Sequence, residues 1–148
     1  MPRIESLSFA VDVPDGWEDF TDTVNAPEPP FTLACPETGM GALQFSVALF
    51  KGGEIPDPST LDLMEMVKRF GIERELGEPR DVVAESRDLR LAAGSFFGEC
   101  LFLRVWQLSH GQNFAFVTYN CEFGQEGKEL ADCERIVRSM RFVPHEPI

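Results

Sequence analysis

The sequence has few basic residues and few of the side chains that most often carry catalysis or hold metals. It contains 13 lysines and arginines against 25 aspartates and glutamates, with two histidines and four cysteines in 148 residues. The net charge of -12 argues against nucleic acid or an anionic membrane as a partner, because phosphate groups would repel the chain. A basic protein partner remains compatible with this charge, and so does the simpler role of keeping the protein in solution.

The four cysteines are far apart in the sequence. Cys35, Cys100, Cys121 and Cys133 form no C-x-x-C pair, so no zinc site is predicted. Two of them fall in an apolar hairpin and Cys133 falls on the apolar stripe of a helix, where free cysteine behaves as a small hydrophobic residue. We expect buried thiols, with a disulfide between Cys100 and Cys121 as the alternative.

Motifs for catalysis and for cofactor binding are also missing. His110 lies in a predicted turn and His145 in the C-terminal tail, so spacing gives neither histidine a partner for acid–base chemistry. The sequence has no G-x-S-x-G nucleophile motif and no phosphate-binding loop. We therefore predict a protein that is not an enzyme, with no catalytic residue, no metal and no cofactor.

Long apolar runs are absent as well. The first 17 residues lack the apolar core of a signal peptide, and no segment is long enough to cross a bilayer. We expect a cytoplasmic protein. The length and the hydrophobic content of 43% predict one domain over residues 1–148, with a flexible tail at 144–148.

The most apolar stretch of the chain, residues 99–123, predicts the centre of the fold. Two strands at 100–108 and 113–123 flank a polar turn that contains Gly111. Apolar residues occupy nearly every position of both strands, whereas a strand with one wet face would alternate. Both faces of this hairpin should therefore be covered.

Shorter patterns predict the remaining elements. Alternating apolar residues predict strands at 7–13, 31–35 and 42–50, and a further strand at 82–93 that is interrupted or bulged around 85–87. A short strand or an irregular segment is expected at 17–24.

Helical spacing of apolar residues predicts two helices, at 59–70 and 126–140. Ser59 and Asp62 form a capping-box-like pair at the start of the first helix. The order of elements predicts an α+β fold in which an antiparallel sheet of about six strands has helices packed on both faces, an α/β/α sandwich.

Several of these features resemble the PsbP-like superfamily, which includes DcrB-type bacterial proteins. They are the V-P-D-G-W turn at 13–17, the long hairpin ending in Thr118 and Tyr119, and the C-terminal helix closing on S-M-R-F at 139–142. The resemblance implies an α/β/α sandwich and a binding module without catalysis. Members of such families include photosystem subunits, GTPase-binding proteins and chaperones of type VI secretion effectors.

Acidic residues are concentrated near the start of the chain. Residues 1–30 hold seven acidic residues and one basic residue, Arg3. A solvated acidic face is the default interpretation, and docking to a basic partner is the functional one. We predict a partner-binding surface made of this acidic segment and the rim of the central hairpin, with these residues: Asp12, Asp15, Glu18, Asp19, Asp22, Arg104, Gln107, His110 and Gln112.

The leading hypothesis is a bacterial immunity protein that neutralises a cognate basic toxin or effector domain by covering it with an acidic surface. The alternative is a type VI secretion effector chaperone, which would bind an effector through an apolar groove and form dimers. A small enzyme that uses scattered carboxylates is a weaker alternative. Monomer and homodimer both stay open at this point.

Overall fold

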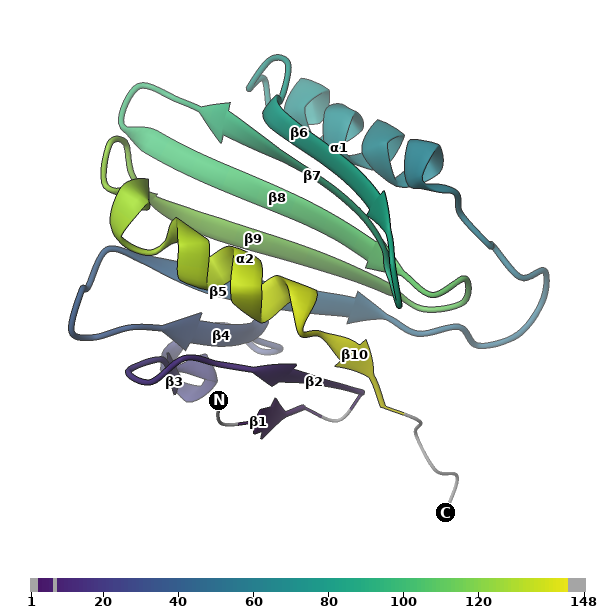
Figure 1. The fold of residues 1–148 in the computed structure, drawn as a ribbon, viewed down its shortest axis with the longest axis horizontal. Coiled ribbons are helices and arrows are strands. Elements are labelled where there is room, and N and C mark those ends of the chain that lie inside the picture. Colours follow the sequence, from purple (N-terminus) through teal and green to yellow (C-terminus); the bar gives the residue numbers. More distant parts are fainter. Residues whose placement is uncertain (1–2, 7, 144–148) are drawn as a thin grey trace.

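The computed structural model describes residues 3–6 and 8–143. Its largest element is a seven-stranded sheet in the order β3-β4-β5-β9-β8-β7-β6 (Figure 1), and every neighbouring pair of strands is antiparallel. Its strands are β3 (Glu18–Asp19), β4 (Phe31–Ala34), β5 (Gly41–Ala48), β6 (Arg80–Ser86), β7 (Arg90–Phe97), β8 (Leu101–Ser109) and β9 (Phe114–Glu122). The predicted α+β class with an antiparallel sheet is confirmed, and the predicted number of strands was too low.

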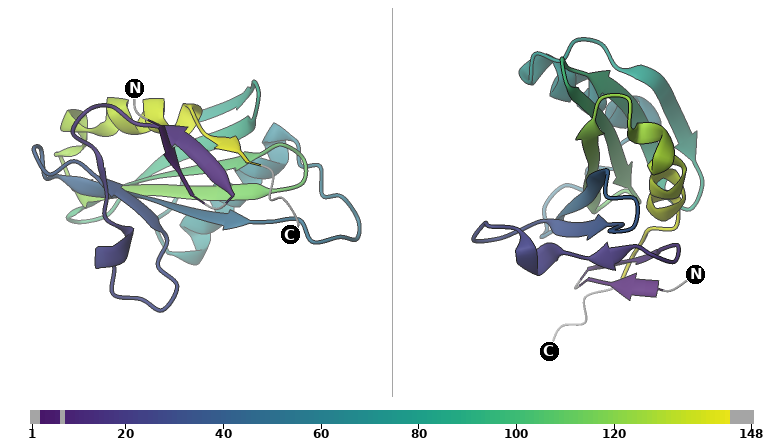
Figure 2. Two further views of the ribbon diagram at one scale, coloured as in Figure 1. Left: turned by 90° about the horizontal axis from the view of Figure 1, so that it is seen from below. Right: turned by 90° about the vertical axis from the view of Figure 1, so that its left-hand side faces the viewer.

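A second, three-stranded sheet joins the two ends of the described chain. Its order is β1-β2-β10, formed by β1 (Arg3–Glu5), β2 (Phe9–Asp12) and β10 (Arg141–Phe142). Figure 2 shows this small sheet on the same side of the large sheet as the C-terminal helix. Phe9 stacks on Phe45 of β5, with 5.2 Å between the ring centroids, so the small sheet is packed directly onto the large one.

The predicted central hairpin is confirmed as β8 and β9, which pair along nine residues each. Adjacent residues in β8 contact different helices, because side chains alternate between the two faces of a sheet. Val105 packs in a cluster with Leu63 and Val67 of α1 (Thr60–Glu73). Trp106 belongs to the larger cluster that contains Ile136 and Val137 of α2 (Leu130–Arg138).

Coverage of β9 is uneven, which corrects the expectation that both faces of the hairpin are covered. Ala115 and Val117 are buried, whereas Phe114, Phe116 and Thr118 are only half-buried. The reason is the position of α1, which contacts β6, β7 and β8. The helix covers β9 on that face only at its edge, where Phe70 packs on Phe116 with 5.4 Å between ring centroids.

The start of α1 matches the predicted capping box. The backbone N–H of Asp62 donates to Ser59 Oγ at 3.1 Å, and Ser59 N–H donates to Asp62 Oδ2 at 2.9 Å. The helix ends at Glu73, three residues past the predicted end at 70, and includes Gly71. A Cβ at Gly71 would lie 2.4 Å from the Phe96 ring, so this glycine lets the helix approach the sheet closely.

Three other boundaries differ from the prediction. The segment 82–93 forms parts of two strands, β6 and β7, joined by a turn at 87–89, and the irregularity lies earlier, at Asp81 with φ +50. The final helix begins at Leu130, after the 3-10 turn η2 (Glu126–Lys128). The segment 17–24 contains β3 and the 3-10 turn η1 (Thr21–Thr23).

The four cysteines are free thiols, so the Cys100–Cys121 disulfide is not formed. Cys35, Cys121 and Cys133 are buried as expected, but Cys100 is exposed because it lies in the β7–β8 turn, before the strand begins. Leu7, His145 and the predicted flexible tail at 144–148 lie outside the described residues. No helix within the described part of the chain is long and apolar enough to cross a membrane.

Candidate functional site

Carboxylates from four segments gather at one end of the large sheet. The segments are the residues leading into β3, the β4–β5 turn, the β7–β8 turn and the connection from β9 to α2, which lie at the left of Figure 1. Strand pairing brings them together, since Glu18 is paired with Ala34, Gly41 with Cys121 and Leu101 with Glu122. We call this region the acidic end and define it by six carboxylates: Asp15, Glu18, Glu37, Glu99, Glu122 and Glu126.

The carboxylates of the acidic end have no cationic partners. Among the described residues, none of the six forms an ion pair. Five are exposed and Glu126 is half-buried. Lys128 is the single basic residue in these four segments, and Arg80 at the start of β6 lies next to them, over the ring of Phe97. The local field is therefore strongly negative and attracts a positively charged partner.

The five acidic residues predicted as a binding surface are not equivalent in the structure. Asp15 and Glu18 belong to the acidic end, and Asp19 and Asp22 are exposed close to them in β3 and η1. Asp12 is different, because it is half-buried and its Oδ1 lies 3.3 Å from Arg141 Nη2. Its negative charge is already paired within the fold, so Asp12 does not belong to the free acidic surface.

Two of the four residues predicted on the rim of the hairpin are buried. Arg104 is 4% exposed and Gln107 is 7% exposed, so neither is available to a partner. His110 and Gln112 are exposed in the β8–β9 turn, at the opposite end of the sheet from the acidic end. Nine residues of strand separate the two ends by about 30 Å, so these residues do not form one surface with the acidic end.

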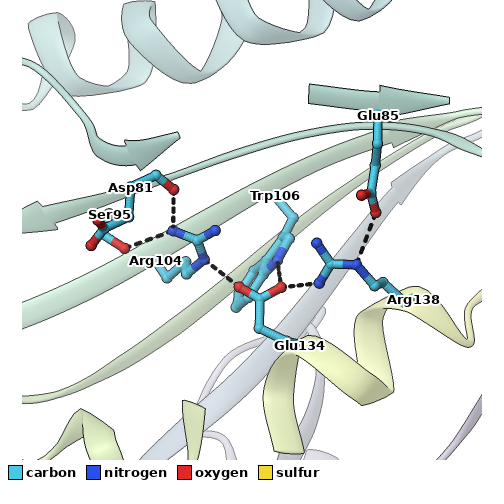
Figure 3. A network of polar contacts seen from close by, with 7 residues as sticks. All are labelled: Asp81, Glu85, Ser95, Arg104, Trp106, Glu134 and Arg138. Atoms are coloured by element: carbon cyan, nitrogen blue, oxygen red, sulfur yellow. Dashed lines mark hydrogen bonds and ion pairs between the residues drawn. The ribbon is translucent and has the colours of Figure 1, made fainter. Parts of the chain in front are cut away.

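Arg104 is buried because it belongs to an ion-pair network under α2 (Figure 3). Its Nε donates to Glu134 Oε1 at 2.5 Å, and its Nη1 donates to Ser95 Oγ at 2.8 Å and to the Asp81 carbonyl at 3.0 Å. The Asp81 contact fixes the backbone at the irregularity in β6. A buried guanidinium needs hydrogen-bond acceptors around it, and these three groups supply them.

Glu134 links the buried Arg104 to Arg138 and Glu85, which are closer to the protein surface. Its second carboxylate oxygen accepts from Trp106 Nε1 at 3.2 Å and also pairs with Arg138, which in turn pairs with Glu85 at 2.8 Å. Burial by itself raises the pKa of Glu134, but the charge of Arg104 and the hydrogen bond from Arg138 outweigh it and lower the pKa overall. We define the ion-pair network as Arg104, Glu134, Arg138 and Glu85, two positive and two negative charges.

Glu129 is buried, whereas Glu134 is half-buried, and Glu129 was not singled out from the sequence. It is 2% exposed and accepts hydrogen bonds from Tyr119 Oη at 2.8 Å, Gly41 N–H at 3.0 Å, Met40 N–H at 3.3 Å and the Thr38 hydroxyl. It ties the start of α2 to the β4–β5 turn. A signal was present, since Glu129 precedes Cys133 by four residues and so lies on the apolar stripe.

The phenol and the thiols near Glu129 are held in their neutral forms. Burial, together with the hydrogen bond to Glu129, raises the pKa of Tyr119. Burial also raises the pKa values of Cys121 and Cys133. A thiol acts as a nucleophile only as thiolate, so neither of these two cysteines is activated.

An apolar cavity of about 420 Å³ opens on the uncovered part of the sheet beside α1. Met66 of α1 forms one side, and Phe114 and Phe116 of β9 form much of the floor, with Gln107 at its edge. This cavity results from the limited reach of α1, which covers the half-buried residues of β9 only in part. It offers an apolar binding surface separate from the acidic end.

Two larger cavities, of about 510 and 740 Å³, adjoin His110 and Phe142 at the other end of the sheet. The first cavity is lined by residues of both charges, and its Arg138 and Arg141 are already paired with carboxylates. Lys51 is the charged residue that lines the second. Within the described ranges, no three His, Cys, Asp or Glu side chains are grouped as metal ligands.

Comparison with known proteins gives the fold and no closer relationship. No model of a known family matches the sequence, and no curated protein matches it. A crystal structure of a protein from Bacteroides thetaiotaomicron VPI-5482 is similar with a TM-score of 0.60 and 14% identity, over 92% of this chain and 45% of that one. The chain thus spans less than half of that protein.

A second similar structure is the solution structure of cyanobacterial PsbP, CyanoP, from Synechocystis sp. PCC 6803. Its TM-score is 0.57 and its identity 12%, over 96% of this chain and 92% of CyanoP. Nearly the whole of both chains is therefore superimposed, which agrees with the resemblance noted in the sequence. The chain has a PsbP-like fold.

Proposed function

We propose that this chain is a non-enzymatic bacterial protein-binding domain that docks on a basic partner through the acidic end. The observation that supports the proposal is the set of six carboxylates without ion pairs among the described residues, with Lys128 and Arg80 as the basic residues near them. Within this class we propose an immunity protein, with a cognate toxin or effector domain as the partner.

The physical argument concerns the charge of such toxins. A toxin that acts on an anionic substrate presents a basic active site, and an acidic protein can cover it. Complementary charge raises the association rate and selects against wrong partners. The acidic end suits this role because none of its six carboxylates forms an ion pair among the described residues.

The test compares two double charge reversals that change the net charge equally. Glu18→Lys with Glu37→Lys alters the acidic end, whereas Glu54→Lys with Asp88→Lys alters exposed acids at the other end of the sheet. Each variant is titrated against the protein encoded by the adjacent gene at 50 and 300 mM salt. We expect the first variant to lose at least tenfold in affinity and the second to lose less than twofold.

Protection of cells is the functional readout of the same experiment. Co-expression of the wild type should restore growth to cells that produce the neighbouring protein, and the Glu18→Lys/Glu37→Lys variant should restore it less. Equal effects of both double reversals would contradict docking through the acidic end. Binding without any growth effect would contradict the immunity role while leaving the docking surface in place.

A second function, a chaperone for a secreted effector, is favoured by the apolar cavity beside α1. Met66 and the half-exposed aromatic rings of β9 offer adaptable apolar contacts. In that case Met66→Lys should abolish binding of the effector, and the charge reversals at the acidic end should not. The chaperone is also expected to be a dimer by light scattering.

A further inference from the structure

The aromatic residues at the acidic end form a small cluster that already contains one arginine. Phe97 and Phe123 pack edge to face, with 5.6 Å between ring centroids. The guanidinium carbon of Arg80 lies 5.1 Å from the centroid of Phe97. The fold therefore places a cation over the first ring of this cluster.

Phe123 is the ring of this cluster that stays accessible to a partner. It is 52% exposed, and no arginine or lysine of the described residues lies over it. A half-exposed phenylalanine costs hydrophobic free energy that burial against a partner would recover. Phe123 is thus available for a contact of the kind that Arg80 makes with Phe97.

The backbone around Phe123 is held in place by local hydrogen bonds. Phe123 N–H donates to the Cys100 carbonyl at 2.9 Å, and Gly124 N–H donates to Glu126 Oε1 at 2.9 Å. Gly124 has φ +91, a conformation that suits glycine. A fixed loop loses little entropy on binding, which favours its use as an anchor.

Carboxylates flank the open ring in sequence and in space. Glu122 precedes Phe123, Glu126 bonds to the next residue, and Glu99 neighbours the cysteine whose carbonyl accepts from Phe123. An arginine guanidinium can stack on an aromatic face and pair with a carboxylate at the same time, which a lysine ammonium does less well. Both features therefore fit the same side chain.

We propose that Phe123 is the anchor of the acidic end and that it stacks against an arginine of a basic protein partner, with a flanking carboxylate pairing the same guanidinium. The inference rests on the proposed docking through the acidic end and names the partner's chemistry. The partner carries an exposed arginine in a basic segment, rather than a lysine-rich surface of the same charge.

Fluorescence anisotropy with labelled nona-arginine and nona-lysine peptides of equal charge tests this inference on the whole chain. The wild type should bind nona-arginine about two- to fivefold more tightly than nona-lysine. Phe123→Leu keeps apolar area but removes the aromatic face, so it should abolish that preference. Ile72→Ala, which changes an apolar side chain 73% exposed on α1, should leave it unchanged.

The two proposals fail in different ways. A preference for nona-arginine that survives Phe123→Leu, or the absence of any preference in the wild type, would overturn the role of Phe123. Peptide binding that is absent, or that is unaffected by Glu18→Lys/Glu37→Lys, would overturn docking through the acidic end itself. Far-ultraviolet circular dichroism of each variant confirms that it is folded.

Discussion

The ion-pair network under α2 and the acidic end differ in whether their charges are compensated by opposite charges. In the network, two arginines meet two glutamates, and Arg104 is 4% exposed. At the acidic end, five exposed carboxylates and the half-buried Glu126 form no ion pair among the described residues, and the basic residues near them are Lys128 and Arg80. Buried charge must be matched group by group, whereas exposed charge is tolerated cheaply because water and salt screen it. We infer that the network maintains the fold and that the acidic end is free to interact.

The largest expected effect comes from breaking the network at its centre. Glu134→Gln removes the negative charge beside Arg104 and should lower the free energy of unfolding by about 3 kcal/mol, because a buried guanidinium loses its partner. Urea denaturation at pH 7 measures this loss. Glu37→Gln at the acidic end is the matched control, and an equal loss in both variants would remove the distinction between the two regions.

Glu129 should give the next largest effect. Glu129→Gln replaces an oxygen that accepts hydrogen bonds with an amide that donates, so at least one of the four donors around it loses its acceptor. We expect a loss of about 2 kcal/mol in the free energy of unfolding. Hydrogen exchange should then speed up first at Met40 and Gly41, and unchanged exchange there would show that Glu129 does not hold the β4–β5 turn.

The pH dependence of stability should reveal the lowered pKa of Glu134. Because the folded state favours the charged carboxylate, its contribution is fully present above the pKa of the unfolded chain, near 4.3. That contribution is lost as the pH falls through the lower value of the folded state. The stability difference between wild type and Glu134→Gln should therefore shrink between pH 7 and pH 3. A difference that grows on acidification would reverse the sign of the assigned shift.

The smallest expected effect on stability belongs to the acidic end. Glu18→Lys with Glu37→Lys should change the free energy of unfolding by no more than about 0.5 kcal/mol, since both side chains are exposed and unpaired. A small gain is expected at low salt, because repulsion between neighbouring carboxylates is relieved. Thermal unfolding at 20 and 300 mM salt measures both quantities. A large loss would mean that these acids hold the fold rather than a partner.

The sequence predicted those parts of the fold that depend on local patterns. The apolar hairpin gave β8 and β9, and the capping box at Ser59 gave the start of α1. The strand β1 was not predicted, because three residues carry too short a pattern. The pairing of β10 with β2 joins segments far apart in the chain, which no local pattern encodes.

Only some of the residues that form the acidic end were predicted from the sequence. An excess of acidic residues near the start of the chain pointed to Asp15 and Glu18, but Glu99, Glu122 and Glu126 join them only through strand pairing. Arg104 was expected on the rim of the hairpin and is buried instead. Its burial depends on Glu134, which lies 30 residues further along the chain, and that contact is visible only in three dimensions.

The small sheet has a consequence for how the chain folds during synthesis. Ala10 of β2 pairs with Arg141 of β10, so β2 leaves the ribosome long before its partner exists. At the usual rate of translation this delay is on the order of 10 s, during which Phe9 and Val11 lack part of their final surroundings. In the seven-stranded sheet β9 lies between β5 and β8, so these two strands are joined only after β9 has been synthesised. We expect nascent chains that end before residue 141 to remain sensitive to protease near β2, while longer chains become resistant.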